Sequence, residues 1–231
     1  QAVESAHLAF PMWSRFTIEE RFASLQNFNV VLQQAAEQFA EIISMEIGKP
    51  LWESRQEVST MLKKLEQAFE SYDKRCRSQD YLQGKTADRT RFRAHGVMAV
   101  FGTFNLPARL SNGHIVPALL AGNTVVFKPS EQSALTGEFL VRKWNEAGLP
   151  KGVLNLIQGA ADAGKSLCAH PSVAGIFFTG SYAVGSQIHR QIGGHPQKIL
   201  SLEMGGNNPL IVSEIEDLEA AAYLTISSAF M

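Results

Sequence analysis

The sequence predicts an α/β protein built on a mainly parallel sheet. From residue 97 onward, short apolar runs alternate with stretches of helical pattern, and this alternation is typical of β-α-β units. The runs expected to form strands lie at 97–101, 124–127, 153–157, 175–178 and 209–212, with a further β-like run at 198–201. The helices are expected at 112–121, 133–147, 163–169, 182–192 and 217–231. Because a parallel sheet binds ligands at the carboxyl ends of its strands, the turns after these runs are where function is expected.

The first third of the chain is predicted to be helical and structural. Apolar residues recur at helical spacing over 17–46, and Thr17 stands just before two glutamates, as at a helix start. Gly48 and Pro50 are expected to end this helix, and a second amphipathic helix is predicted from 51 to about 72. No catalytic pattern is visible in this part of the sequence, so we expect it to support the sheet.

The segment from 73 to 96 is more highly charged than its surroundings. Within it, 91–93 reads Arg-Phe-Arg, an alternation typical of an exposed or edge strand. We therefore predict an arm over about 84–96 that leaves the main body and serves subunit contact.

Composition limits the possible functions of the chain. Its 231 residues include 45% hydrophobic and 19% charged residues, and the net charge is −1. This near-neutral charge gives no indication of a nucleic-acid partner, and no apolar run approaches the roughly 20 residues that a membrane span needs. Cys76 and Cys168 show no metal-ligand spacing, so neither a metal site nor a disulfide framework is expected. A cytoplasmic protein without a membrane partner is predicted.

Two turns after predicted strands carry polar residues suited to ligand binding. Asn105 follows the run 97–101, and its amide can donate a hydrogen bond to a developing oxyanion. Lys128, Ser130 and Glu131 follow the next run, where a carboxylate can accept from both hydroxyls of a nucleotide ribose and repel a 2′-phosphate. Each pattern also occurs without function, as an asparagine turn before proline or as a solvated charge cluster.

The segment 159–166 matches the phosphate-binding pattern G-x-x-x-x-G-K-S of nucleotide hydrolases. It follows a predicted strand and opens a predicted helix, as such a loop requires. Against this interpretation, Asp162 would place a carboxylate inside the phosphate cradle, and no later apolar strand ends in an aspartate that could hold Mg²⁺. A P-loop nucleotide hydrolase therefore remains an alternative function.

The turn after 175–178 offers another place for a phosphate. Backbone amides at the start of the next helix, together with the helix dipole, can bind an anion there. The residues of this turn are Gly180, Ser181, Tyr182, Ala183, Val184 and Gly185.

Most of the chain can be understood as a scaffold for the stretch 202–209, Leu-Glu-Met-Gly-Gly-Asn-Asn-Pro. Glu203 ends a β-like run directly before two glycines, which allow a backbone to approach a ligand closely. A carboxylate in this position is well placed for proton transfer. The alternative is an ordinary turn that carries a surface glutamate.

Taken together and in this order, these segments resemble the aldehyde dehydrogenase family. The matching segments are Asn105-Leu106-Pro107, 122–131, Phe178-Thr179-Gly180-Ser181 and Glu203-Met204-Gly205-Gly206-Asn207. The resemblance covers nearly the whole chain. It implies an NAD-binding domain over 1–231, in which a Rossmann-like sheet is preceded by an N-terminal helical segment. It also implies an aldehyde as substrate and a homo-oligomer as the assembly.

The resemblance also implies roles for individual residues. Glu203 would be the general base that activates water, and Asn105 the oxyanion donor. Lys128, Ser130 and Glu131 would hold the adenosine ribose. The turn 180–185 would hold the pyrophosphate, and Gly159 and Gly164 would line the adenine side of the cofactor.

In this family the nucleophilic cysteine follows the general base by about one helix. No cysteine lies between Glu203 and Met231, and the chain both starts and stops within helical pattern. We therefore expect a domain truncated at both ends, which lacks the catalytic domain and is inactive alone. A nucleotide-binding module without catalysis is the non-enzymatic alternative.

Overall fold

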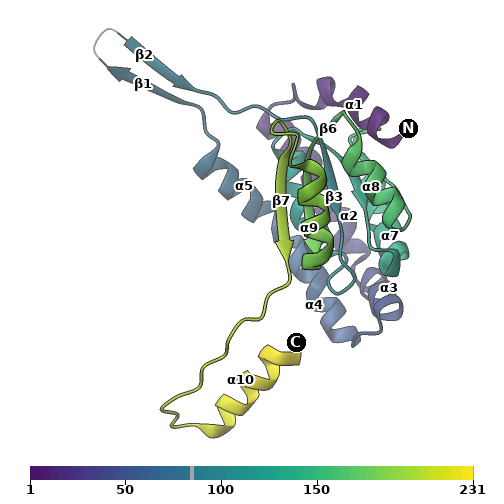
Figure 1. Ribbon diagram of the computed structural model, residues 1–231, viewed down its shortest axis with the longest axis vertical. Helices are drawn as coiled ribbons and strands as arrows, with labels where there is room; N and C mark the ends of the chain where they lie inside the picture. The colour runs from purple at the N-terminus through teal and green to yellow at the C-terminus, as the bar shows by residue number, and fades with distance from the viewer. Residues whose placement is uncertain (84–85, 231) are drawn as a thin grey trace.

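The computed structural model describes residues 1–83 and 86–230, and it confirms the predicted α/β fold. A five-stranded sheet in the order β5-β4-β3-β6-β7 forms its centre (Figure 1). Each neighbouring pair of strands in this sheet is parallel. The strands are β3 (Val97–Phe101), β4 (Thr124–Lys128), β5 (Leu154–Leu156), β6 (Val173–Gly180) and β7 (Ile199–Met204).

The strand order creates a switch point between β3 and β6. From β3 the chain proceeds outward through β4 to β5, and it then crosses back to β6 and continues to β7. The connections after β3 and β6 therefore leave in opposite directions, and this opens a crevice at the carboxyl edge of the sheet. The turns that the sequence singled out all lie at this edge.

Helices cover both faces of the sheet and divide the core. One face packs against α1 (Ala2–Trp13), α8 (Ala161–Ala169) and α9 (Tyr182–Ile192). The other face carries α2 (Ile18–Gln34), α3 (Ala36–Ile47), α4 (Leu51–Leu62), α5 (Lys64–Arg75), α6 (Arg109–Leu120) and α7 (Ala134–Glu146). Along β3, Val97 and Ala99 belong to the first core, whereas Met98 and Val100 belong to the second, as the alternation of a strand requires.

Each of the two long helices predicted at 17–46 and 51–72 is in fact a pair of helices. The first is interrupted at Ala35, between α2 and α3, and the second at Lys63, between α4 and α5. A break of a single residue leaves the spacing of apolar residues almost unchanged, so periodicity does not reveal it. The predicted start is confirmed, because Thr17 forms a reciprocal capping box with α2.

The charged segment after α5 forms a β-hairpin rather than the edge strand predicted at 91–93. Strands β1 (Gln79–Gln83) and β2 (Thr86–Thr90) pair antiparallel and project from the body (Figure 1). The projecting arm thus begins before the predicted span 84–96, of which residues 84 and 85 lie outside the described residues. Arg91 lies beyond β2 and makes an ion pair with Asp80 at 2.7 Å, which ties the base of the hairpin together.

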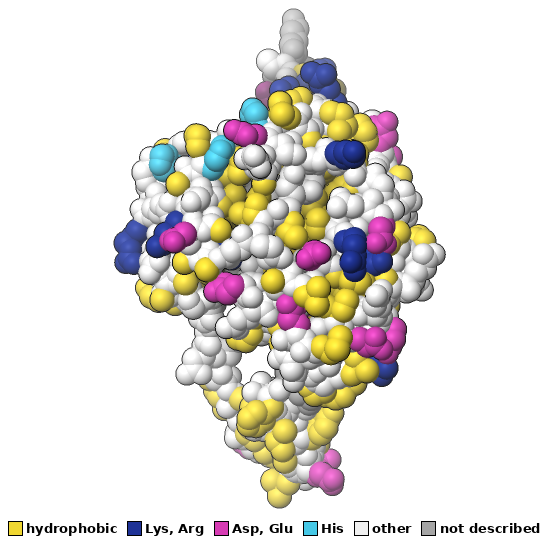
Figure 2. Space-filling view, turned by 90° about the vertical axis from the view of Figure 1, so that its right-hand side faces the viewer, with side chains coloured by type: hydrophobic (Ala, Val, Ile, Leu, Met, Phe, Trp, Pro, Cys, Tyr) yellow, Lys and Arg dark blue, Asp and Glu magenta, His cyan; other side chains and the backbone are white. Residues whose placement is uncertain are grey.

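The strand predicted at 209–212 is wrong. These residues follow β7 as an extended segment, and Ile211 is 84% exposed. The segment leads to α10 (Leu218–Phe230), which stands apart from the sheet in Figure 1 and has no buried residue. Hydrophobic side chains are correspondingly exposed at this lower end of the molecule in Figure 2. A strand requires a neighbouring strand for its backbone hydrogen bonds, and an apolar pattern alone cannot supply one.

Among the described residues, no helix has the length and apolar character needed to cross a membrane.

Candidate active site

A pocket of about 780 Å³ lies at the carboxyl edge of the sheet, where the turns after β3, β4, β6 and β7 meet. Its volume falls within the usual range for sites that bind small molecules or cofactors. The structure brings most of the predicted site residues to its wall: Asn105, Lys128, Ser130, Glu131, Gly164, Gly180, Ser181, Val184 and Glu203. The predicted residues outside this wall are Gly159, Tyr182, Ala183 and Gly185.

Lys128 and Glu131 form the polar corner of the pocket after β4. The Lys128 ammonium is buried and lies 3.7 Å from a Glu131 carboxylate oxygen, which is itself exposed. Burial lowers the pKa of Lys128, and Glu131 opposes that shift. Ser130 accepts a hydrogen bond from the Gln132 amide at the start of a short 3₁₀ turn, Glu131–Ser133. A fixed cation beside an exposed carboxylate suits a ligand that carries hydroxyl groups.

The start of α9 lies close against the ends of β6 and β7. A Cβ atom on Gly185 of α9 would approach the Met204 sulfur of β7 to 2.5 Å and the Phe178 ring of β6 to 3.4 Å. This close approach favours glycine at position 185, so Gly185 contributes through packing rather than by lining the pocket. Ser181 caps the helix by accepting from the Val184 amide at 3.3 Å. Ser181 and Val184 both line the pocket, so α9 begins at its wall.

The segment 159–166 does not form a phosphate cradle. Helix α8 begins at Ala161, so the Gly164 amide is already used in a hydrogen bond to the Ala160 carbonyl. The Lys165 ammonium lies 3.7 Å from an Asp162 carboxylate oxygen, and both side chains are exposed. A P-loop needs the backbone amides of this segment to be free to bind phosphate. The geometry therefore disfavours the nucleotide-hydrolase alternative.

Glu203 lies where the large pocket meets a second one. The second pocket has a volume of about 310 Å³, and Glu203 and Thr179 line both pockets. The two residues are paired in register across β6 and β7, so they lie side by side. Glu203 is exposed, lines both spaces, and its carboxylate makes no hydrogen bond within the described part of the chain. A carboxylate in this position can contact groups bound on either side.

His114 of α6 belongs to this junction, although the sequence analysis did not single it out as a site residue. Its Nε2 lies 3.1 Å from the Thr179 hydroxyl, and its ring stacks on Phe177. Burial lowers the pKa of His114 and Lys64 lowers it further, whereas Glu203 opposes the shift. The neutral imidazole is therefore favoured near pH 7. Its sequence position, on a helix without a recognisable motif, gave no signal of this role.

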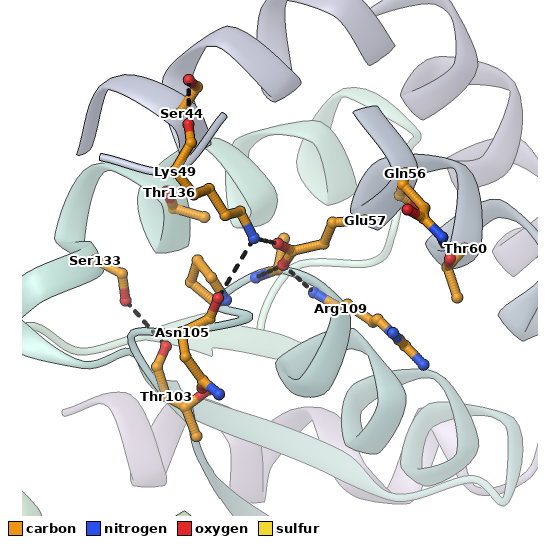
Figure 3. A network of polar contacts seen from close by, with 12 residues as sticks. Ser44, Lys49, Gln56, Glu57, Thr60, Thr103, Asn105, Arg109, Ser133 and Thr136 are labelled. Atoms are coloured by element: carbon orange, nitrogen blue, oxygen red, sulfur yellow. Dashed lines mark hydrogen bonds and ion pairs between the residues drawn. The ribbon is translucent and has the colours of Figure 1, made fainter. Parts of the chain in front are cut away.

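A buried ion pair supports the loop that carries Asn105 (Figure 3). Glu57 of α4 is 2% exposed and pairs with Lys49. One Glu57 oxygen also accepts hydrogen bonds from the backbone amides of Ala108 and Arg109, both at 2.9 Å. Lys49 donates in turn to the Asn105 carbonyl at 3.3 Å. The backbone at Asn105 is held in this way, while its side-chain amide makes no hydrogen bond to any described residue and lies at the pocket wall.

Cys168 also reaches the pocket wall but is not suited to nucleophilic attack. It lies on α8 and is 1% exposed, and burial raises the pKa of its thiol to about 11. At neutral pH it is therefore a protonated thiol rather than a reactive thiolate.

The comparisons with known proteins agree with this geometry. The family model described as "Aldehyde dehydrogenase family" matches residues 1–231, and the chain therefore belongs to the aldehyde dehydrogenase family. Among characterised relatives, the N-succinylglutamate 5-semialdehyde dehydrogenase of Pseudomonas fluorescens is 49% identical over 230 residues. That match covers 100% of this chain and 47% of the relative. The chain thus spans about half the length of the curated relatives it matches.

Two solved structures illustrate the fold. An NADP dependent enzyme of Escherichia coli matches with a TM-score of 0.93 and 32% identity, over 99% of this chain and 48% of its own. The glyceraldehyde-3-phosphate dehydrogenase GapN of Methanocaldococcus jannaschii, solved as a complex with NADP, matches with a TM-score of 0.83 and 30% identity. This second match covers 90% of the chain and 46% of the archaeal enzyme.

The buried pair predicts a large effect of Glu57 on stability. Glu57→Gln leaves the Lys49 ammonium without its charge partner, and breaking a buried pair costs roughly 3–5 kcal/mol. Urea denaturation followed by circular dichroism measures the loss. Glu37→Gln is the matched control, because Glu37 pairs with Arg55 on the surface and its removal should change the midpoint little. Equal effects of the two substitutions would contradict a supporting role for Glu57.

Proposed function

We propose that the protein carrying this chain oxidises an aldehyde to a carboxylic acid with NAD⁺, and that its substrate is N-succinylglutamate 5-semialdehyde, in arginine catabolism. The observation that carries the proposal is the position of Glu203 between two pockets, since the reaction needs a base between a cofactor and a substrate. The relative that is 49% identical over 230 residues supports the choice of substrate.

In this proposal, different residues of the chain have different roles in the reaction. Asn105 donates its side-chain amide to the oxyanion formed on the substrate carbonyl. Glu203 removes a proton from the water that releases the product acid. NAD⁺, when bound, supplies the hydride acceptor. The large pocket fits a dinucleotide, with Glu131 accepting from the ribose, Lys128 fixing that carboxylate, and the first turn of α9 binding the pyrophosphate.

In the same proposal, the attacking cysteine belongs to a catalytic domain outside this chain. The sequence has no cysteine between Glu203 and Met231, and the geometry of Cys168 does not replace one. The chain is then the cofactor-binding part of the enzyme. The hairpin of β1 and β2 projects from the body, as an arm for pairing with a second subunit would, and we propose a homo-oligomer on that basis. A cytoplasmic location stays a prediction.

The cofactor assignment predicts an order of ligand effects on melting temperature. NAD⁺ should stabilise the chain most, by roughly 2.7 kcal/mol at 100 times its Kd. NADP⁺ should do so less, because its 2′-phosphate meets the Glu131 carboxylate. Mg-ATP should have little effect. Differential scanning fluorimetry at matched concentrations measures all three.

Two variants sharpen this test. Glu131→Gln should narrow the preference for NAD⁺ over NADP⁺, and Glu138→Gln, an exposed carboxylate on the nearby helix α7, should leave it unchanged. Preferential stabilisation by Mg-ATP that Lys165→Ala abolishes would favour the P-loop hydrolase instead. Equal stabilisation by NAD⁺ and NADP⁺ would contradict the role of Glu131.

The role of Glu203 predicts a separation of two kinetic phases in the enzyme that includes the nucleophile. Glu203→Gln should slow acid release, with a fall in steady-state rate of about 10²- to 10⁴-fold. A rapid burst of NADH should survive, because hydride transfer precedes the step that needs the base. Stopped-flow measurement of NADH absorbance resolves the burst and the steady-state phase. A burst followed by a slower steady state is expected when catalysis passes through a covalent intermediate. Loss of the burst would assign Glu203 to an earlier step. Glu216→Gln, in the exposed segment after β7, is the control and should change neither phase.

A further inference from the structure

The smaller pocket has a basic wall that the reaction scheme does not use. It lies between the end of α4, the start of α5 and the start of α6, and its inner end is closed by Thr179 and Glu203. Lys64 and Arg109 contribute cationic side chains to this wall, beside Gln67, Thr60 and His114. With a volume of about 310 Å³, the pocket has room for a small organic acid.

Neither cation in this pocket has an ion-pair partner among the residues that the structure describes. Among the described residues, the ion pairs that involve basic side chains near the site are Lys49 with Glu57, Lys128 with Glu131 and Lys165 with Asp162, and none involves Lys64 or Arg109. The nearest buried carboxylate, Glu57, is already occupied by Lys49 and by two backbone amides. Because His114 favours its neutral form, the remaining negative charge in the lining is that of Glu203. The pocket therefore has an excess of positive charge.

The local structure fixes the backbone positions from which the Lys64 and Arg109 side chains extend. Arg109 is the first residue of α6, and Glu57 holds its backbone amide at 2.9 Å. In Figure 3 the Arg109 side chain extends away from the Lys49–Glu57 pair instead of joining it. Lys64 is the first residue of α5, directly after the break at Lys63, and its Cε would lie 3.8 Å from a Cβ placed on Gly113 of α6. Both cations are thus presented at the same end of α6.

We infer that Lys64 and Arg109 bind a carboxylate of the substrate, and that this pocket selects aldehydes that carry a negative charge at the end remote from the carbonyl. The inference rests on the proposed function, in which the aldehyde lies near Glu203. N-succinylglutamate 5-semialdehyde has carboxylates on the side of the molecule away from its aldehyde. With a carboxylate on the two cations, the aldehyde points toward Glu203, which lines both pockets, and so toward the large pocket that Asn105 lines.

The test first measures binding, using the stable product N-succinylglutamate as the probe. Isothermal titration with the full chain should show binding that weakens as ionic strength rises, because charges near the surface are screened. Lys64→Gln and Arg109→Gln should each raise Kd by about 10- to 100-fold, as expected for the loss of a charge-assisted hydrogen bond. Lys63→Gln is the matched control, since Lys63 precedes Lys64 but does not line the pocket. Unchanged Kd values in both variants would overturn the inference.

A second measurement separates this inference from the proposed function. In the enzyme that includes the nucleophile, the ratio of kcat/KM for N-succinylglutamate 5-semialdehyde to that for pentanal reports the selection for charge. Lys64→Gln and Arg109→Gln should lower this ratio about 10- to 100-fold, mainly through KM, whereas Lys63→Gln should preserve it. Oxidation of both aldehydes with a ratio that no variant changes would refute the carboxylate site and leave the proposed function standing. Absence of NAD⁺-dependent oxidation of either aldehyde would refute the proposed function itself.

Discussion

The order of strands in the parallel sheet is the constraint on which the candidate site depends. Because β3 and β6 are neighbours although the chain visits β4 and β5 between them, the loops after them diverge and open the large pocket. The β6–β7 pairing then places Glu203 beside Thr179 at the same edge. A different order would separate Asn105, which follows β3, from Glu203, which belongs to β7. The chemistry thus follows from the topology before any single contact is considered.

The distribution of charge gives the two pockets different characters. At the large pocket, Lys128 is paired with Glu131, and this leaves a corner suited to hydroxyl groups. At the small pocket, Lys64 and Arg109 are unpaired among the described residues, and this favours an anion. The Lys49–Glu57 pair lies behind the loop between β3 and α6 and is buried, so its contribution is to hold the backbone of that loop in place. The same α4 carboxylate therefore supports Asn105 and the start of α6.

Much of the fold could be predicted from sequence, for physical reasons that particular residues illustrate. The strands β3 and β4 are buried along their whole lengths and are mostly apolar, since both sides of each strand are covered. The run at 209–212 has the same apolar character and is not a strand, because no strand lies beside it. The breaks at Ala35 and Lys63 escaped prediction because helical periodicity continues across them. Local pattern identifies candidate elements, whereas pairing and changes of helix direction depend on the rest of the molecule.

The candidate site could be predicted where its residues follow strands. Asn105, Lys128, Glu131 and Glu203 all stand after or at the end of such runs, and all reach the large pocket. Glu57, Lys64 and His114 gave no such signal, because they lie on helices among other polar residues and acquire their roles only through packing between helices. Gly159 met the pattern of a ligand-binding loop but lies outside the pocket wall, whereas Gly164, within α8, reaches it.

The proposed position of Glu203 between a cofactor pocket and a substrate pocket can be tested by simultaneous binding of the two ligands. The chain is labelled with ¹³C at the glutamate carboxyl groups and observed by NMR. It is titrated with NAD⁺ and with N-succinylglutamate, first singly and then together. The Glu203 signal is assigned by its loss in Glu203→Gln. We expect each ligand alone to shift the Glu203 signal, and the second ligand to bind without displacing the first. Mutual displacement of the two ligands, or a Glu203 signal that responds to neither, would contradict the account.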